Sequence, residues 1–273
     1  MALGNRIATA LCTDVGKVRG NNEDSVAEDP EIGLLVLADG MGGYNAGEVA
    51  SQIAVRTIVD VVRTEWQESS LSARVRQDGP SPEAVLLEHA VQAAHQAIFR
   101  AAQSDAQMAG MGTTVVAVLL HDNRMVVAHV GDSRLYRYRF GQLRQVTRDH
   151  SLLEELVAKG HFSREDAATM VRKNIVTRAL GVDPQVKVDV TEEALDVGDF
   201  LLLCSDGLSD MVPDEAMRLS LHRYGDDLPA AAGNLVDLAL AQGGKDNVSV
   251  ILARVDRPFG RGRAWYARLL DWI

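Results

Sequence analysis

The chain combines short, continuous apolar runs with two long amphipathic stretches. The runs over residues 33–38, 200–204 and 248–255 predict strands, and the first has the unbroken apolar character of a strand buried on both faces. Apolar residues recur at helical spacing over residues 45–66, and Asn45 is suited to cap that helix. A second long helix is predicted over residues 82–103, because Pro82 suits a first helical turn.

The middle of the chain changes to β-branched and aromatic runs. Runs over residues 113–120, 125–130 and 135–138 are separated by turn-forming sequences, so we predict a three-stranded antiparallel meander. A further strand is predicted over residues 186–190, and Pro213 and Pro229 each suit the first turn of a helix. Strands in clusters with long helices between them favour an α+β layered domain over a βαβ repeat.

The overall charge and the cysteine content narrow the class of protein. The 273 residues carry a formal net charge of −10, which argues against DNA or RNA as a partner because phosphate backbones attract Lys and Arg. The two cysteines, Cys12 and Cys204, lie in apolar runs and favour a reducing cytosol over a disulfide framework. No signal peptide or bilayer-spanning segment is evident, so we expect a cytoplasmic protein.

Five aspartates lie in turn-like sequences beside the predicted strands: Asp24, Asp39, Asp132, Asp206 and Asp246. Each alone has the alternative interpretation of an ordinary turn former. As a set they would converge if the strands are sheet neighbours, and their charges would repel unless a cation neutralised them. Oxygen ligands without nearby His or Cys favour Mg²⁺ or Mn²⁺ over zinc.

Such a cluster suits phosphoryl chemistry, in which two ions about 3.5–4 Å apart activate water and hold phosphate oxygens. Arg19 lies just ahead of the first acidic turn. Its guanidinium can hold phosphate through two parallel hydrogen bonds, and a solvated surface arginine is the alternative interpretation. The residues by themselves therefore point to a metal-dependent enzyme that acts on phosphate.

Six motifs occur in an order typical of one family. They are residues 13–24 (Thr-Asp-Val-Gly-Lys-Val-Arg-Gly-Asn-Asn-Glu-Asp), 38–43 (Ala-Asp-Gly-Met-Gly-Gly), 112–114 (Gly-Thr-Thr), 130–134 (Val-Gly-Asp-Ser-Arg), 205–208 (Ser-Asp-Gly-Leu) and 245–247 (Lys-Asp-Asn). In these motifs the chain resembles the metal-dependent type 2C serine/threonine protein phosphatases (PPM), from about residue 9 to residue 255. The Asp-Gly-Met-Gly-Gly form resembles the bacterial branch.

The resemblance implies a fold and a domain layout. The fold would be a four-layer α-β-β-α sandwich, with two antiparallel sheets flanked by pairs of helices. Residues 1–256 would form the catalytic domain, with a flap at about residues 147–181 beside the site. Residues 257–273 form a short basic and aromatic tail. That tail has three open interpretations: packing on its own domain, docking in a partner groove, or binding an anionic membrane surface.

The resemblance also implies the metal ligands. Asp39 would bridge two ions, Mn²⁺ or Mg²⁺. Asp206 and Asp246 would hold the first ion. The Gly40 carbonyl and Asp24, the latter through water, would serve the second ion.

Further roles are implied around this pair of ions. Asp132 and Asp210, together with Asp206 from the first ion's site, resemble a weaker third metal site. Arg19 would hold the substrate phosphate, and Glu23 would orient water. Some relatives carry His directly after Asp-Gly as a proton donor, but this chain has Met41, which has no proton to donate.

The implied activity is hydrolysis of phosphoserine and phosphothreonine in proteins by a metal-activated water, without a covalent intermediate. The implied partners are phosphorylated proteins, including a cognate Ser/Thr kinase and its substrates, and we expect a monomer. Two alternatives stay open. A catalytically silent binding module is disfavoured because the expected carboxylates are all present. The second alternative is a two-metal esterase that acts on small phosphorylated metabolites or on a nucleic acid. The acidic charge disfavours the nucleic acid, and small molecules stay open.

Overall fold

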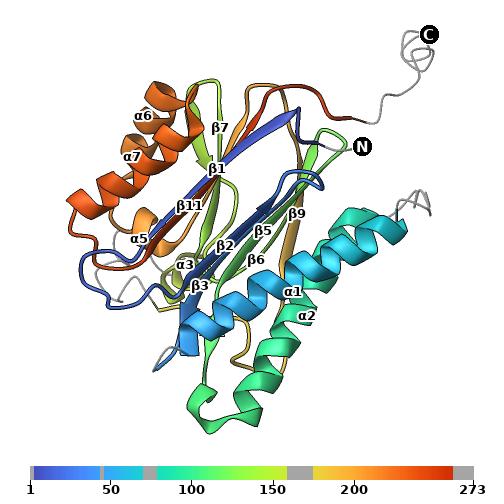
Figure 1. The fold of residues 1–273 in the computed structure, drawn as a ribbon, viewed down its shortest axis with the longest axis vertical. Coiled ribbons are helices and arrows are strands. Elements are labelled where there is room, and N and C mark those ends of the chain that lie inside the picture. Colours follow the sequence, from blue (N-terminus) through green and yellow to red (C-terminus); the bar gives the residue numbers. More distant parts are fainter. Residues whose placement is uncertain (1–2, 44–45, 70–78, 159–174, 261–273) are drawn as a thin grey trace.

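Two antiparallel β-sheets form the centre of the structure (Figure 1). The structure is a computed structural model and describes residues 3–43, 46–69, 79–158 and 175–260. The first sheet contains, in spatial order, β1 (Ile7–Asp14), β11 (Val248–Val255), β10 (Phe200–Cys204), β7 (Arg134–Arg139) and β8 (Gln142–Gln145). The second contains β2 (Asp24–Asp29), β3 (Leu34–Met41), β5 (Val115–His121), β6 (Arg124–Val130) and β9 (Asp189–Ala194), and the short β4 (Gly112–Thr113) pairs with the end of β3.

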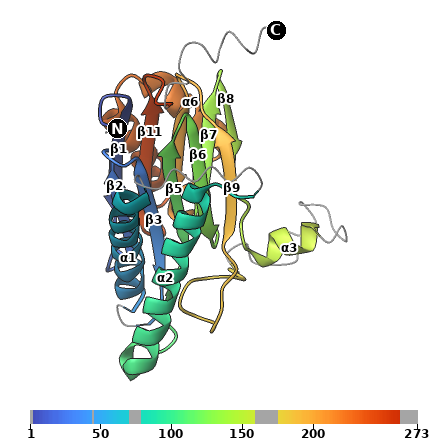
Figure 2. The ribbon, with the colours of Figure 1, turned by 90° about the vertical axis from the view of Figure 1, so that its right-hand side faces the viewer.

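Pairs of helices cover the outer faces of the two sheets (Figures 1 and 2). α1 (Ala46–Ser69) and α2 (Pro82–Ser104) pack on the second sheet, and α6 (Asp214–Tyr224) and α7 (Leu228–Ala241) pack on the first. Shorter elements are η1 (Ala106–Met108), α3 (Leu152–Ala158) and α5 (Asp206–Ser209). The predicted four-layer α-β-β-α sandwich of the α+β class is confirmed.

The alternation of side chains along β3 explains its unbroken apolar sequence. Leu34, Val36 and Ala38 point into the core beneath α1 and α2, whereas Leu35 and Leu37 point into the core between the two sheets. Both faces of β3 are therefore covered, and the burial of these side chains holds the strand in the middle of the molecule. The continuous apolar run is the direct consequence, as the sequence predicted.

The predicted three-stranded meander is wrong for its last strand. β5 and β6 pair as expected, but β7 belongs to the other sheet, where it pairs with β8 and β10. The chain crosses between the sheets at the turn after β6, where Gly131 has a φ of 105° and its backbone lies against Thr114. A side chain at position 131 would collide with Thr114, so this crossing requires glycine.

Three further boundaries differ from the sequence prediction. Asp24 opens β2 instead of lying in a turn, and β3 continues through Asp39 and Gly40 to Met41. β9 covers Asp189–Ala194, so the predicted strand over residues 186–190 overlaps only its first two residues. β2 and β9 were difficult to predict because both are edge strands with half-buried, mostly polar sequences.

Some predictions concern residues outside the described ranges. Asn45, the predicted cap of α1, is one of them, as are residues 159–174 of the predicted flap and 261–273 of the tail. The predicted start of α2 at Pro82 is confirmed, and Ser81 caps this helix by accepting a hydrogen bond from the Ala84 N–H at 3.0 Å. Among the described helices, none combines the length and apolar character needed to cross a bilayer.

Candidate active site

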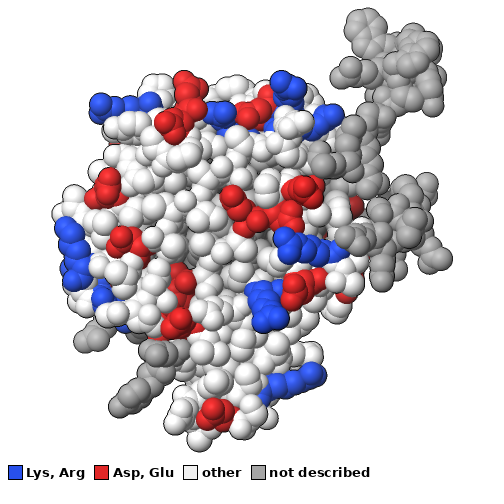
Figure 3. Space-filling view, in the orientation of Figure 1, with Lys and Arg blue, Asp and Glu red and all other residues white. Residues whose placement is uncertain are grey.

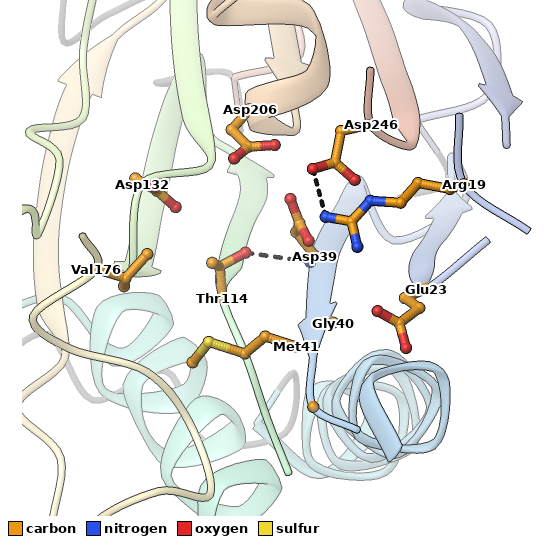
Figure 4. Close-up of a pocket in the computed structure, with 11 residues that line it drawn as sticks. Arg19, Glu23, Asp39, Gly40, Met41, Thr114, Asp132, Val176, Asp206 and Asp246 are labelled. Atoms are coloured by element: carbon orange, nitrogen blue, oxygen red, sulfur yellow. Dashed lines mark hydrogen bonds and ion pairs between the residues drawn. The ribbon is translucent and has the colours of Figure 1, made fainter. Parts of the chain in front are cut away.

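A polar pocket of about 270 Å³ opens where the ends of the two sheets meet (Figure 4). Most residues that the sequence selected lie around it. The lining residues are Arg19, Glu23, Asp39, Gly40, Met41, Gly42, Thr114, Asp132, Val176, Asp206 and Asp246. Two selected residues, Asp24 and Asp210, lie behind this lining instead of in it.

Asp39 lies at the centre of the acidic group. Its carboxylate extends from β3 between Asp206 and Asp246 (Figure 4). Antiparallel pairing places Asp24 of β2 directly opposite Asp39. Burial raises the pKa of Asp39 well above its ordinary value, and the neighbouring carboxylates, Asp24 foremost, raise it further. Bringing these groups together without a cation is therefore costly.

Asp206 and Asp246 reach the pocket from the first sheet. β10 and β11 are antiparallel neighbours. Asp206 follows the end of β10 and Asp246 precedes β11, so both carboxylates lie at the same end of the first sheet. Burial, followed by the charges of Asp132 and Asp246, raises the pKa of Asp206 to about 8. The sequence analysis could only assume that these strand ends come together, and in the structure they do.

Asp132 approaches the pocket from the turn between β6 and β7. It is buried, and burial together with the charge of Asp149 raises its pKa to about 6. Asp210 follows α5 and contributes to the raised pKa values of both Asp132 and Asp206, so it lies within electrostatic reach of the site. Asp132 and Asp206 form the side of the pocket away from Arg19 (Figure 4), and Asp210 lies behind them.

Arg19 is the cation of the pocket lining. Its Nη2 donates to Asp246 Oδ2 at 2.7 Å, and this hydrogen bond raises the pKa of the guanidinium. About half of the Arg19 side chain is exposed, at 51%. Glu23 lies on the same side, where burial raises the pKa of its carboxyl. A half-exposed guanidinium at the rim of a carboxylate-lined pocket can meet an incoming phosphate.

The residues present fit hard divalent cations. The lining offers carboxylate and backbone oxygens and no imidazole or thiolate. Behind it, Asp24 Oδ1 is buried and has no hydrogen-bond partner among the described residues, while Oδ2 accepts from Ser205 Oγ at 2.8 Å. An ideal Cβ on Gly40 would lie 2.1 Å from the Gly47 carbonyl oxygen, so only glycine allows the backbone of β3 to pass there.

A second group of ligand-type residues has a different character. Among the described residues, His129, His150 and Asp189 are the set whose ligand atoms all lie within 4.8 Å of one another. Arg178 already supplies a cation there, because its NH1 donates to Asp189 Oδ1 at 2.9 Å. The two imidazoles are stacked, so their in-plane lone pairs do not converge.

Comparison with known proteins decides the family. The sequence model of protein phosphatase 2C matches residues 17–234. The serine/threonine phosphatase stp of Listeria monocytogenes is 39% identical over 247 residues, which cover 89% of this chain and 94% of the relative. The chain belongs to the protein phosphatase 2C family. The relatives that this phosphatase matches are named serine/threonine phosphatases.

Solved structures of the family agree with the fold. A Mycobacterium tuberculosis serine/threonine phosphatase, PstP/Ppp, superimposes with a TM-score of 0.80 at 37% identity, covering 92% of this chain and all of that one. The catalytic domain of PstP in complex with two manganese ions superimposes with a TM-score of 0.78 at 36% identity, covering 92% and 99% of the two chains. The phosphatase therefore shares its sandwich with proteins of the bacterial branch.

Sequence reasoning missed several residues that shape the pocket of this phosphatase. Thr114 lines it, and its Oγ1 accepts from the Asp39 N–H at 3.1 Å. Ser205 holds Asp24 in place from the other sheet. Val176 also lines the pocket. The Gly-Thr-Thr and Ser-Asp-Gly motifs contained a signal for Thr114 and Ser205, whereas Val176 was included only through the flap expected at about residues 147–181.

Proposed function

We propose that this phosphatase hydrolyses phosphoserine and phosphothreonine in proteins directly, with two Mn²⁺ or Mg²⁺ ions held by the carboxylates of the pocket. One observation carries the proposal: Asp39, Asp206, Asp246 and Asp132 surround one pocket, and burial raises the pKa of Asp39, Asp206 and Asp132. Buried carboxylates at such cost are typical of a site made for cations. When bound, the ions would lower the pKa of the attacking water and offset charge on the phosphate oxygens.

We assign the ligands as the family resemblance predicts. Asp39 would contact both ions, in keeping with its central place. Asp206 and Asp246 would hold the first ion from the edge of the first sheet. The Gly40 carbonyl and Asp24, the latter through water, would hold the second. Asp24 Oδ1, which has no hydrogen-bond partner within the described part of the chain, supports this role, because a buried acceptor requires a donor, a water or a cation.

A third ion is also proposed, beside Asp132 and Asp210. The negative charges of both carboxylates raise the pKa of Asp206. Glu23, on the opposite side of the pocket, would orient water through its half-buried carboxylate.

The side chains of the pocket would also bind and orient the substrate. Arg19 would hold the phosphate through its planar guanidinium, so that the phosphorus faces the carboxylate-lined end. The oxygen of water would bond to phosphorus as the bond from phosphorus to the seryl or threonyl oxygen breaks. Met41 lines the pocket without a titratable proton, so the leaving oxygen would take its proton from a different group.

The proposed substrates are phosphorylated proteins, among them a cognate Ser/Thr kinase and that kinase's targets. A nucleic acid is not proposed, because the chain is acidic and its charges of both signs are interspersed over the face in Figure 3. Action as a monomer and in the cytoplasm stay predictions from the sequence.

We further propose that residues 1–256 form the catalytic domain. The strands of both sheets lie between residues 7 and 255, and the family match covers 17–234. The proposed flap, residues 147–181, has its ends joined by the bridge between Ser151 and Val176, next to the pocket. Residues 257–273 would form the separate tail.

Hydrolysis of phosphopeptides in Mn²⁺, with and without EDTA, tests the proposed function. We expect phosphate release that EDTA abolishes and added Mn²⁺ restores. Rates on a phosphothreonine peptide and on glucose 6-phosphate should be compared, because a higher kcat/KM on the sugar phosphate would indicate a small-molecule esterase. Activity that survives EDTA would contradict the metal requirement. A first-turnover burst of dephosphorylated peptide without an equal burst of phosphate would contradict direct hydrolysis.

A further inference from the structure

Asn247, between Asp246 and β11, has a side chain whose hydrogen bonds all serve another part of the chain. The residue is 5% exposed. Its Nδ2 donates to the Val15 carbonyl at 2.9 Å and to the Asn21 carbonyl at 2.9 Å. Its Oδ1 accepts from the Glu23 N–H at 2.8 Å. Both amide hydrogens and the amide oxygen are therefore engaged with residues 15–23, which connect β1 to β2 and which we call the Arg19 loop.

The backbone of the Arg19 loop lies directly on the segment that precedes Asn247. The Lys17 N–H donates to the Gly244 carbonyl at 2.7 Å. Gly16 has a φ of 79°, and an ideal Cβ there would lie 2.3 Å from the Asp246 carbonyl oxygen. Asp246 in turn accepts from the Asn247 N–H at 2.9 Å through Oδ1 and from Arg19 through Oδ2. The Arg19 loop therefore packs directly against residues 244–247.

The middle of the Arg19 loop has little packing of its own. Val18 is 69% exposed, and the Arg19 side chain is half exposed. The three hydrogen bonds of Asn247 attach to the loop on both sides of these residues, at Val15 and at Asn21 and Glu23. A loop fixed at both ends in this way has few backbone conformations left between them.

We propose that Asn247 is a positioning residue for phosphate binding: its buried amide fixes the Arg19 loop so that the Arg19 guanidinium faces the pocket. The inference rests on the proposed role of Arg19 in holding phosphate. An amide is required because the site needs two donors and one acceptor on a single short side chain. Asp has the same shape and retains the acceptor, but it would place an oxygen against the carbonyls of Val15 and Asn21.

The first test compares Asn247→Asp with the wild-type enzyme for binding of inorganic phosphate in saturating Mn²⁺, by calorimetry and by inhibition of phosphopeptide hydrolysis. We expect phosphate to bind at least about tenfold more weakly and KM to rise in parallel, with kcat changed by less than about threefold. Asn234→Asp is the matched control, because Asn234 Oδ1 accepts from Ser220 Oγ at 2.8 Å and an aspartate retains that acceptor. Unchanged phosphate binding in Asn247→Asp would overturn the proposal.

A double-mutant cycle with Arg19→Ala separates positioning from general damage. If Asn247 acts through Arg19, Asn247→Asp causes no further loss of phosphate affinity in the Arg19→Ala background. An equal loss in both backgrounds would show that Asn247 acts by another route, such as a charge effect on the neighbouring Asp246. Calorimetric titration of Mn²⁺ into each variant measures that charge effect directly.

Asn247→Ala provides the same information if the aspartate variant does not fold. It removes the three hydrogen bonds without adding a charge, and water can enter the space left by the amide. We expect the same weakening of phosphate binding and the same absence of effect after Arg19→Ala. Failure of the wild-type enzyme to hydrolyse phosphopeptides would contradict the proposed function itself. Hydrolysis by the wild type with unchanged phosphate affinity in Asn247→Ala would contradict this inference alone.

Discussion

Arg19 donates a 2.7 Å hydrogen bond to Asp246 Oδ2, across 227 positions of sequence. Arg19, which we propose binds the substrate phosphate, is thus hydrogen-bonded to an oxygen of Asp246, which we propose binds a metal ion. With 51% of the Arg19 side chain exposed, an ion pair of this kind contributes little to stability and can be exchanged readily. Arg19 and the proposed metal ion would therefore be alternative partners for Asp246 Oδ2.

Replacing Arg19 should have opposite effects on the two ligands. In Arg19→Ala we expect KM for a phosphopeptide to rise by about tenfold or more, because the phosphate loses a charged, forked partner. Mn²⁺ should bind at least as tightly as in the wild type, because a competing cation is gone. Kinetics and calorimetry measure the two effects. Arg19→Lys, which retains the charge and loses the fork, is the control; weaker Mn²⁺ binding in Arg19→Ala would refute the idea of exchange.

Replacing Asp39 should separate activity from stability. Asp39→Asn should lower kcat by about a thousandfold or more, because the central carboxylate is lost from the site. In EDTA the same variant should melt at a higher temperature than the wild type, by at least about 2–4 °C, the shift expected for about 1 kcal/mol in a protein of this size. Calorimetric scans and phosphopeptide assays measure both quantities. A lower melting temperature in EDTA would mean that repulsion around Asp39 does not destabilise the metal-free protein.

In the metal-free protein, the contribution of Asp206 and Asp132 to stability should fall as the pH rises from about 4 to 8. Folding raises the pKa of Asp206 from 3.8 to about 8 and that of Asp132 to about 6. Each aspartate favours the folded state most when it is protonated. Its contribution to stability is fully present below the pKa of the unfolded state and is lost as the pH rises through the pKa of the folded state. Urea unfolding in EDTA across this range is the measurement.

Two controls accompany this pH series. Asp206→Asn should flatten the profile most between pH 6 and 8, because it removes the group with a pKa of about 8. Saturating Mn²⁺ should lessen the pH dependence, because the cation replaces the protons. A wild-type profile that falls no more steeply than that of Asp206→Asn between pH 6 and 8 would be incompatible with a raised pKa of Asp206.

Gly40→Ala should destabilise the fold strongly. The added Cβ would lie 2.1 Å from the Gly47 carbonyl oxygen and 2.6 Å from that of Glu23, so backbone would have to move. We expect a loss of about 2 kcal/mol or more, measured by urea unfolding in EDTA. Gly43→Ala is the matched control, since its Cβ would meet no atom within 4 Å. Equal stability of the two variants would contradict the close approach of β3 to α1.

The sequence predicted the interior of the fold better than its edges. The strands at Phe200–Cys204 and Val248–Val255 were placed correctly because burial on both faces leaves an unbroken apolar run. β2 was missed because an edge strand with the sequence Asp-Ser-Val-Ala-Glu-Asp has no such run. β7 was assigned to the wrong sheet, because a strand's own residues do not state which strand it will pair with.

By itself, the sequence determined which residues could carry the chemistry: the aspartates in ordered motifs, Arg19 ahead of them, and methionine at position 41. Tertiary structure alone decided what these residues do to one another. The distance from Arg19 to Asp246, the raised pKa of Asp39 and the contacts of Asn247 with a loop more than two hundred residues away depend on how two sheets stack. Such long-range contacts arise when buried strands from distant segments pair and pack, and local sequence patterns do not encode that pairing.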